Sequence, residues 1–173
     1  MDHTDTGLRA VVKALTDVIG PAVNTTDPLA SEQLRLTVDY IEFVRSRIDF
    51  LYDRERFDLH HHLDMAKALD EIVDASDFAE RIALKNAIEA GMRADAAPGL
   101  SIRALKETTA ALAAAIAALI RKAQTLNETT RQRIERHVLE ASDARIAFER
   151  SWYLPLGFDP APGEVKTLEE FLG

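Results

Sequence analysis

Apolar residues recur every three or four positions along most of the chain, which predicts amphipathic α-helices. The first such stretch covers residues 6–19, and Gly20-Pro21 is expected to end it. Nowhere do β-branched and aromatic residues alternate with polar ones for long enough to indicate a strand. The pattern therefore predicts an all-α protein. The apolar stripe of the first helix consists of Leu8, Val11, Val12, Leu15, Val18 and Ile19.

The second predicted helix carries the widest apolar surface of the chain. Asp27 is expected to be its N-cap, with Pro28 at the first helical position. Two apolar lines follow, which together cover more than half of the helix circumference. Such a helix must touch two or more neighbours, either at the centre of a bundle or in a subunit interface. The first line is Leu29, Leu36, Phe43, Phe50 and Phe57, and the second is Leu34, Ile41, Val44, Ile48, Leu51 and Tyr52.

The same helical pattern continues as far as Val73, so the second helix is either very long or bends near residues 53–60. Three further helices follow. The first of them has a weaker apolar pattern, and the last two are long. A short connector joins these two, so they should be antiparallel neighbours. The expected boundaries are Ser76 and Ser101 as N-caps, Pro98-Gly99 as a loop, residues 127–130 as the connector and Pro155 as the stop.

The last 20 residues, 154–173, read as an irregular tail that still contains large apolar side chains. We expect Trp152 and Phe158 to pin it to the bundle, and Thr167 with Glu170 to form a capping box for one last helical turn. The predicted fold is therefore a four-helix-type bundle with a short extra N-terminal helix and a tail packed on its surface. It forms a single domain over residues 1–173.

Composition places the chain among globular proteins, because 47% of its residues are apolar and 29% charged. It contains no cysteine, which excludes disulfides, thiolate zinc sites, iron–sulfur clusters and cysteine nucleophiles. A net charge of -8 argues against nucleic-acid binding. The polar start is no signal peptide, and the longest apolar run, residues 110–120, is too short for a bilayer, which needs about 20 residues.

These features predict a soluble, cytoplasmic protein without membrane contact. The excess of arginine over lysine and the abundance of alanine suggest a bacterial source. Catalytic motifs are missing: the sequence has no Gly-rich phosphate loop, no G-x-S-x-G elbow, no S-x-x-K pair and no H-E-x-x-H motif. We therefore assign no catalytic residue, expect no cofactor, and favour a non-enzymatic function.

A polar cluster interrupts the apolar face of the second helix at Arg54, Glu55, Asp58 and His62. Arg54 can reach Asp58 one turn later. One interpretation is that the helix leaves the core or bends here, so that these residues are solvated. The other is a polar pocket that binds a small molecule, where burial would perturb the pKa values.

Asp58 and His61 also have the spacing of a carboxylate–histidine metal pair, as found in di-iron bundles. Those bundles need a second pair, and Ile134 stands where its acid would precede His137. Asp58 and His61 are thus weak candidates for metal ligands. They belong to the alternative function, a small-molecule- or metal-binding bundle.

Aromatic residues supply the third candidate feature, because Trp, Tyr and Arg are preferred anchors at protein interfaces. The favoured function is association, either with a second copy as a homodimer or with another protein. The candidate interface residues are Phe43, Phe50, Phe57, Trp152 and Tyr153.

Overall fold

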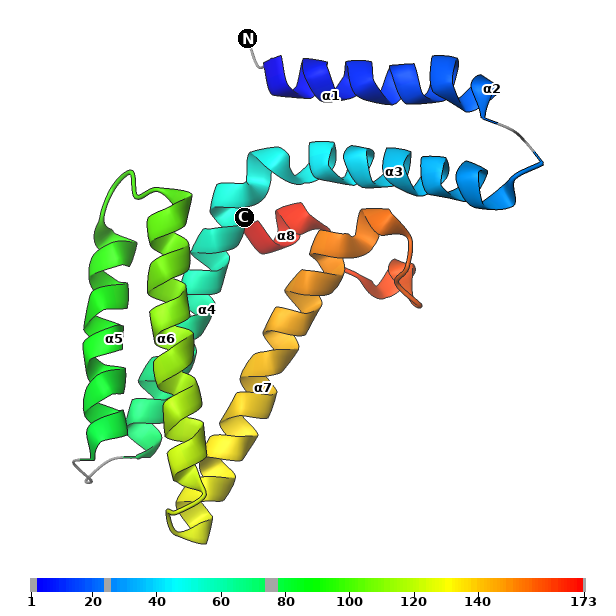
Figure 1. Ribbon diagram of the computed structural model, residues 1–173. Helices are drawn as coiled ribbons and strands as arrows, with labels where there is room; N and C mark the ends of the chain where they lie inside the picture. Colours follow the sequence, from blue (N-terminus) through cyan, green and yellow to red (C-terminus); the bar gives the residue numbers. More distant parts are fainter. Residues whose placement is uncertain (1–2, 24–25, 74–77, 173) are drawn as a thin grey trace. The chain divides into compact units, whose positions relative to one another are not determined.

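A computed structural model describes residues 3–23, 26–73 and 78–172 (Figure 1). All regular elements in these ranges are helical, which confirms the all-α prediction. The chain divides into two compact units. We call residues 51–149 with 166–173 the bundle unit, and residues 1–50 with 150–165 the hairpin unit. Within the described ranges, no helix is long and apolar enough to cross a membrane.

The bundle unit is built around α4 (Leu51–Ile72), which packs against α5 (Ala79–Ala96) and α6 (Ile102–Ala123). Leucines dominate the core that these three helices share, and α7 (Glu128–Tyr153) adds Ile134 to it. The side chains with no exposed surface include Leu59, Leu69, Leu84, Leu105, Leu112, Leu119 and Ile134. Of the two apolar lines predicted for the second helix, Leu51 and Tyr52 are exposed on α4, and the residues of α4 in the core lie further along, from Leu59 to Leu69.

A glycine lets α5 approach the other two helices closely. A methyl group built on Gly91 would lie 2.6 Å from Leu63 Cδ2 and 3.0 Å from Leu112 Cδ1. Gly91 is therefore needed for contact between helices, since its helical φ does not itself require glycine.

Helix α7 runs antiparallel to α6 and diverges from it within the bundle unit (Figure 1). The predicted N-cap of α6 is confirmed, because the Ser101 hydroxyl accepts a hydrogen bond from the Ala104 N–H. The connector occupies residues 124–127, earlier than the predicted 127–130. Asn127 accepts a hydrogen bond from the Thr130 N–H and so already caps α7. The cap predicted at Ser76 lies outside the described residues.

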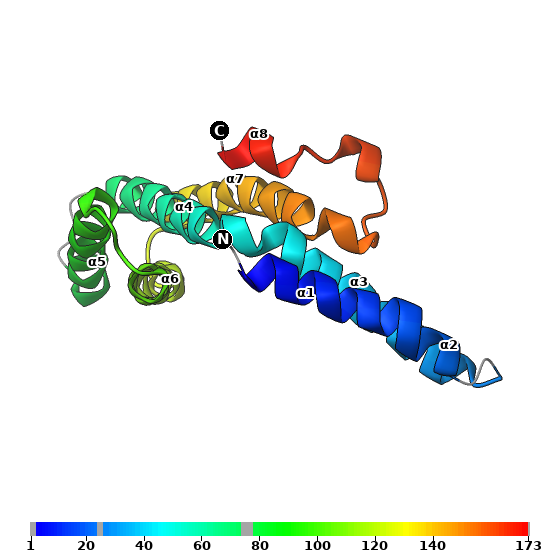
Figure 2. The same ribbon diagram turned by 90° about the horizontal axis from the view of Figure 1, so that it is seen from above.

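The hairpin unit consists mainly of α1 (His3–Ala14) and α3 (Pro28–Arg47), which lie side by side (Figures 1 and 2). The Asp27 N-cap is confirmed: its carboxylate accepts hydrogen bonds from the Leu29 and Ala30 N–H groups. Helix α1 continues through a π-helical turn, Leu15–Ile19, into α2 (Gly20–Ala22). The unit also contains two short 3₁₀ turns, Leu154–Leu156 and Pro162–Glu164.

The prediction that Gly20-Pro21 ends the first helix was wrong. The Gly20 N–H donates to the carbonyl of Leu15, five residues back, which is the π pattern. Such a wide turn gives the ring of Pro21 room beside the preceding carbonyls, where a normal α-turn would clash. The helix therefore passes the proline and ends at Ala22.

The predicted second helix is neither continuous nor bent near residues 53–60. A 3₁₀ turn, Ile48–Phe50, separates α3 from α4, and the boundary between the two units falls there. Just before this turn the Ser46 hydroxyl donates to the carbonyl of Phe43 at 2.8 Å. Serine hydroxyls that bond to the backbone compete with regular helical hydrogen bonds, which favours the interruption.

The tail is held differently from the way we predicted. Phe158 is 76% exposed and pins nothing, whereas Arg150 binds the Asp159 carboxylate through two hydrogen bonds of 2.9 Å. The predicted capping box is confirmed, because the Glu170 carboxylate accepts a hydrogen bond from the Thr167 N–H at 2.7 Å. It begins α8 (Leu168–Leu172), whose first residue is buried.

Candidate functional site

The polar cluster on α4 lies in the packed part of the bundle unit. Glu55 is only 8% exposed, and Arg54, Asp58 and His62 are partly buried. They occupy successive turns of α4, so that one helix carries four polar side chains into a region shielded from water. Burial of this kind requires partners for the charged groups.

Ion pairs from α7 and α6 supply these partners. Arg54 Nη2 lies 3.1 Å from Glu149 Oε1, and Arg145 Nη1 lies 3.5 Å from Asp58 Oδ1. On the other side, Lys106 Nζ of α6 lies 3.4 Å from Glu55 Oε1. The cluster therefore links α4 to both long C-terminal helices. Sequence reasoning found its α4 members and missed these partners, since no local spacing marks them.

The two histidines of the cluster differ in their contacts. His62 Nδ1 lies 2.7 Å from the carbonyl of Asp58, so this nitrogen carries the proton and donates. The His61 ring stacks on Phe57, with centroids 6.3 Å apart, and meets the His62 ring edge-on at 5.4 Å. Burial lowers the pKa of His61, and electrostatic interaction with the neighbouring His62 and Arg145 adds to this effect.

One atom of the cluster is under-satisfied. Asp58 Oδ1 is buried and accepts no hydrogen bond, although Arg145 is within ion-pair distance. The metal hypothesis gains no further ligand: in the described ranges, no three His, Asp or Glu side chains gather as an ion would require. Within these ranges Asp58 and His61 have no third ligand beside them.

The candidate interface aromatics are largely engaged inside the chain. Phe57 stacks on Phe148 with centroids 3.9 Å apart and belongs to the bundle unit. In the hairpin unit Phe43 and Trp152 are buried, and Phe50 is half-buried within the 3₁₀ turn. Of the five, Tyr153 has the most exposed side chain.

A row of three aromatic rings joins α3 to the end of α7 within the hairpin unit. The Phe43 ring lies 5.8 Å from Tyr40 and stacks on Tyr153 at 5.6 Å. The two outer rings, Tyr40 and Tyr153, are exposed. Leu29 and Leu36 precede Phe43 by fourteen and seven residues and so continue the row towards the start of α3. We call Leu29, Leu36, Tyr40, Phe43 and Tyr153 the aromatic face.

This face lies on the side of α3 that points away from α1. The residues of α3 next to α1 are Leu34 and Val38, which line a cavity of about 240 Å³ together with Leu15 of the π turn. At about 100° per residue, Leu36 and Tyr40 fall on the opposite side of the helix. The sequence pattern places Leu36 and Phe43 on one line of the helix, and Tyr40 lies beside this line.

Arg47 holds the end of α7 beside the aromatic face. Its Nε donates to the carbonyl of Trp152 at 2.8 Å, and its Nη2 donates to that of Ser151 at 3.2 Å. The guanidinium also lies 5.7 Å from the centroid of the Trp152 ring. Arg47 thus satisfies two of the last carbonyls of the helix and fixes the backbone that carries Tyr153.

No family model, no curated protein and no solved structure matches this chain.

Proposed function

We propose that the protein acts by association, and that a second copy of the chain binds its aromatic face. The observation that carries this proposal is the apolar side of α3 opposite α1. There Leu29 is 68% exposed and Tyr40 59% exposed, at positions whose spacing continues the buried Phe43. A helix with two opposed apolar sides requires a neighbour on each.

A two-fold symmetric pair would use each of these residues twice. Burying four such side chains contributes roughly 6–12 kcal/mol, against an association cost of roughly 4–15 kcal/mol. The gain and the cost are of the same size, so we expect a weak dimer that forms as concentration rises. Two hairpins packed together would form a four-helix arrangement, the usual way for such helices to enclose a core.

The charges beside the face allow this contact. Arg35 donates to Glu32 at 2.6 Å and to Asp39 at 2.7 Å, so both acids are paired within α3. Pairing with Arg35 lowers the pKa of Glu32, which keeps it ionised. The three groups together carry one net negative charge, so a second α3 would meet weaker repulsion than two unpaired acids would give.

Sedimentation velocity of the full chain over a wide concentration range tests the proposal. We expect the mass to rise from 19.2 kDa towards twice that value. Tyr40→Glu should move the dimer midpoint at least about tenfold higher, because it places a charge in the buried contact. Ile82→Glu is the matched control, since Ile82 is 53% exposed on α5 of the bundle unit. A constant 19.2 kDa mass, or equal effects of both substitutions, would contradict the proposal.

The alternative function, small-molecule binding by the polar cluster, is supported by the buried Asp58 Oδ1 that accepts no hydrogen bond. A ligand with an N–H or O–H donor would satisfy this atom. If the cluster is kept for binding, Asp58→Asn should leave the free energy of unfolding unchanged or raise it. If the Asp58–Arg145 pair serves stability, the same change should lower it by about 1 kcal/mol or more. Chemical denaturation distinguishes the two.

A further inference from the structure

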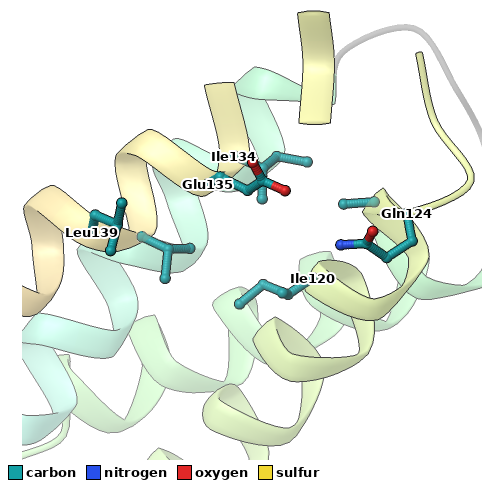
Figure 3. A pocket seen from close by; sticks show the side chains of 7 residues that line it. Ile120, Gln124, Ile134, Glu135 and Leu139 are labelled. Carbon is teal, nitrogen blue, oxygen red and sulfur yellow. The ribbon is translucent and has the colours of Figure 1, made fainter. Parts of the chain in front are cut away.

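A cavity of about 330 Å³ opens between α6 and α7 in the bundle unit, near the connector that joins the two helices (Figure 3). Five of its lining side chains are apolar, a composition and size typical of clefts that hold small organic ligands. They are Ile120, Ala123, Ile134, Val138 and Leu139.

The cavity follows from the divergence of the two helices. Ile134 of α7 is fully buried in the core, whereas Leu139, little more than one turn later, is 70% exposed. Ile120 and Ala123 on α6 face Ile134 and Val138 on α7 across a hollow that therefore has apolar walls.

Two polar side chains lie on opposite walls of this hollow. Gln124, at the C-terminal end of α6, and Glu135, on α7, flank it as Figure 3 shows. The Glu135 carboxylate makes one described ion pair, with Arg131 Nε at 3.8 Å, which is too long for a hydrogen bond.

Arg131 is engaged more strongly elsewhere. It donates to the Glu128 carboxylate at 2.5 Å, which lowers the pKa of Glu128 and raises that of Arg131. Glu135 therefore keeps a negative charge that is only weakly compensated. The last turn of α6 carries Arg121 and Lys122, so the negative charge that would favour a cation here is that of Glu135.

From this combination we propose that the cavity binds a small organic cation, an amine with an apolar body. The body would lie against Ile120 and Val138, and the ammonium group would bind the Glu135 carboxylate and the Gln124 amide oxygen. A neutral ligand would lose the attraction to Glu135, and a carboxylate would be repelled by it. All these residues belong to the bundle unit, so this proposal does not depend on self-association through the aromatic face.

Methyl NMR of the full chain, titrated with three probes of one skeleton, tests the proposal. We expect phenylbutylamine to shift the methyl signals of Ile120, Ile134, Val138 and Leu139. Phenylbutanol should bind roughly two- to fivefold more weakly, as expected for one ion pair with an exposed carboxylate, and phenylbutyrate should bind more weakly still, because Glu135 repels it.

Two pairs of variants sharpen the test. Glu135→Gln should reduce the affinity for the amine to that for the alcohol, whereas Glu140→Gln, an exposed acid on the same helix, should leave both unchanged. Leu139→Ala should weaken the binding of the amine and of the alcohol equally. Because Leu139 is exposed, this substitution should not unfold the protein, and weaker binding would reflect the lost contact.

Equal affinities for the three probes, an amine preference that survives Glu135→Gln, or shifts confined to other methyl groups would overturn the proposal. The titration is repeated with Tyr40→Glu, in which the proposed dimer is weakened. Unchanged amine binding in this variant is expected, and its loss would show that the cavity depends on the second copy and overturn the proposal as stated.

Discussion

The bundle unit and the hairpin unit are made of the same kind of amphipathic helix, yet they differ in how much apolar surface they bury. Helix α6 alone has six buried residues, whereas α3 has one and the described residues of α1 have none. The apolar spacing of residues 8–19 is as regular as that of α6. Regular spacing therefore predicts a helix, but the number of neighbours decides whether its stripe is buried.

The number of neighbours differs for a simple reason. Helix α4 packs against both α5 and α6, so the three helices enclose a core between them. Two helices such as α1 and α3 can bury only the line along which they touch. The hairpin unit thus keeps apolar side chains exposed that the bundle unit would bury.

The largest expected difference concerns leucines. Leu119→Ala should lower the free energy of unfolding by about 2–5 kcal/mol, because it removes a fully buried side chain and leaves a cavity. Leu29→Ala, in the exposed part of α3, should change it by less than about 0.5 kcal/mol in dilute protein. Urea unfolding measures both values. Similar losses for both leucines would mean that the two units are equally well packed.

A glycine in each unit gives the next comparison. Replacing a helical glycine by alanine favours the helix by about 0.5–1 kcal/mol. Gly7→Ala should show this gain, since nothing lies within 4 Å of the added methyl group. At Gly91 the methyl group would overlap Leu63, and overpacking typically costs about 1–3 kcal/mol. We therefore expect opposite signs in thermal unfolding, and a gain at Gly91 would show that the core has room.

The smallest expected effect concerns pH. The pKa of His61 is lowered from 6.5 in the folded protein, chiefly by burial. As the pH falls, His61 is protonated in the unfolded chain before it is protonated in the folded protein, which lowers the free energy of unfolding. This loss is absent above pH 6.5, grows as the pH falls below that value, and is complete below the pKa of His61 in the folded protein. Unfolding free energies at neutral and mildly acidic pH should show a drop that His61→Gln makes smaller. His3→Gln, exposed on α1, is the control and should leave the drop unchanged.

Local signals in the sequence predicted much of the fold. The caps at Asp27 and Ser101 and the capping box of Glu170 were all found from a few neighbouring residues, because each hydrogen bond joins positions two or three apart. The 3₁₀ turn at Ile48–Phe50 was missed, since the apolar lines run through it without a break. The π turn was missed because Gly20-Pro21 normally ends a helix.

In the candidate sites too, the sequence predicts residues that are marked by their neighbours in the chain and does not predict their partners on distant helices. A break in the apolar pattern marked Arg54, Glu55, Asp58 and His62, but their partners on α6 and α7 are 51 to 95 residues away along the chain. No spacing rule reaches that far. Tyr40 was overlooked for another reason: an exposed tyrosine looks like an ordinary surface residue until its contact with Phe43 is known.

Amide hydrogen exchange, measured at low and high protein concentration, tests most directly whether a second copy completes the hairpin unit. We predict that amides of α4, α5 and α6 are strongly protected at both concentrations. Those of α1 and the N-terminal half of α3 should exchange quickly in dilute protein and become protected as concentration rises. Equal protection of both units at low concentration, with no change at high concentration, would contradict the account.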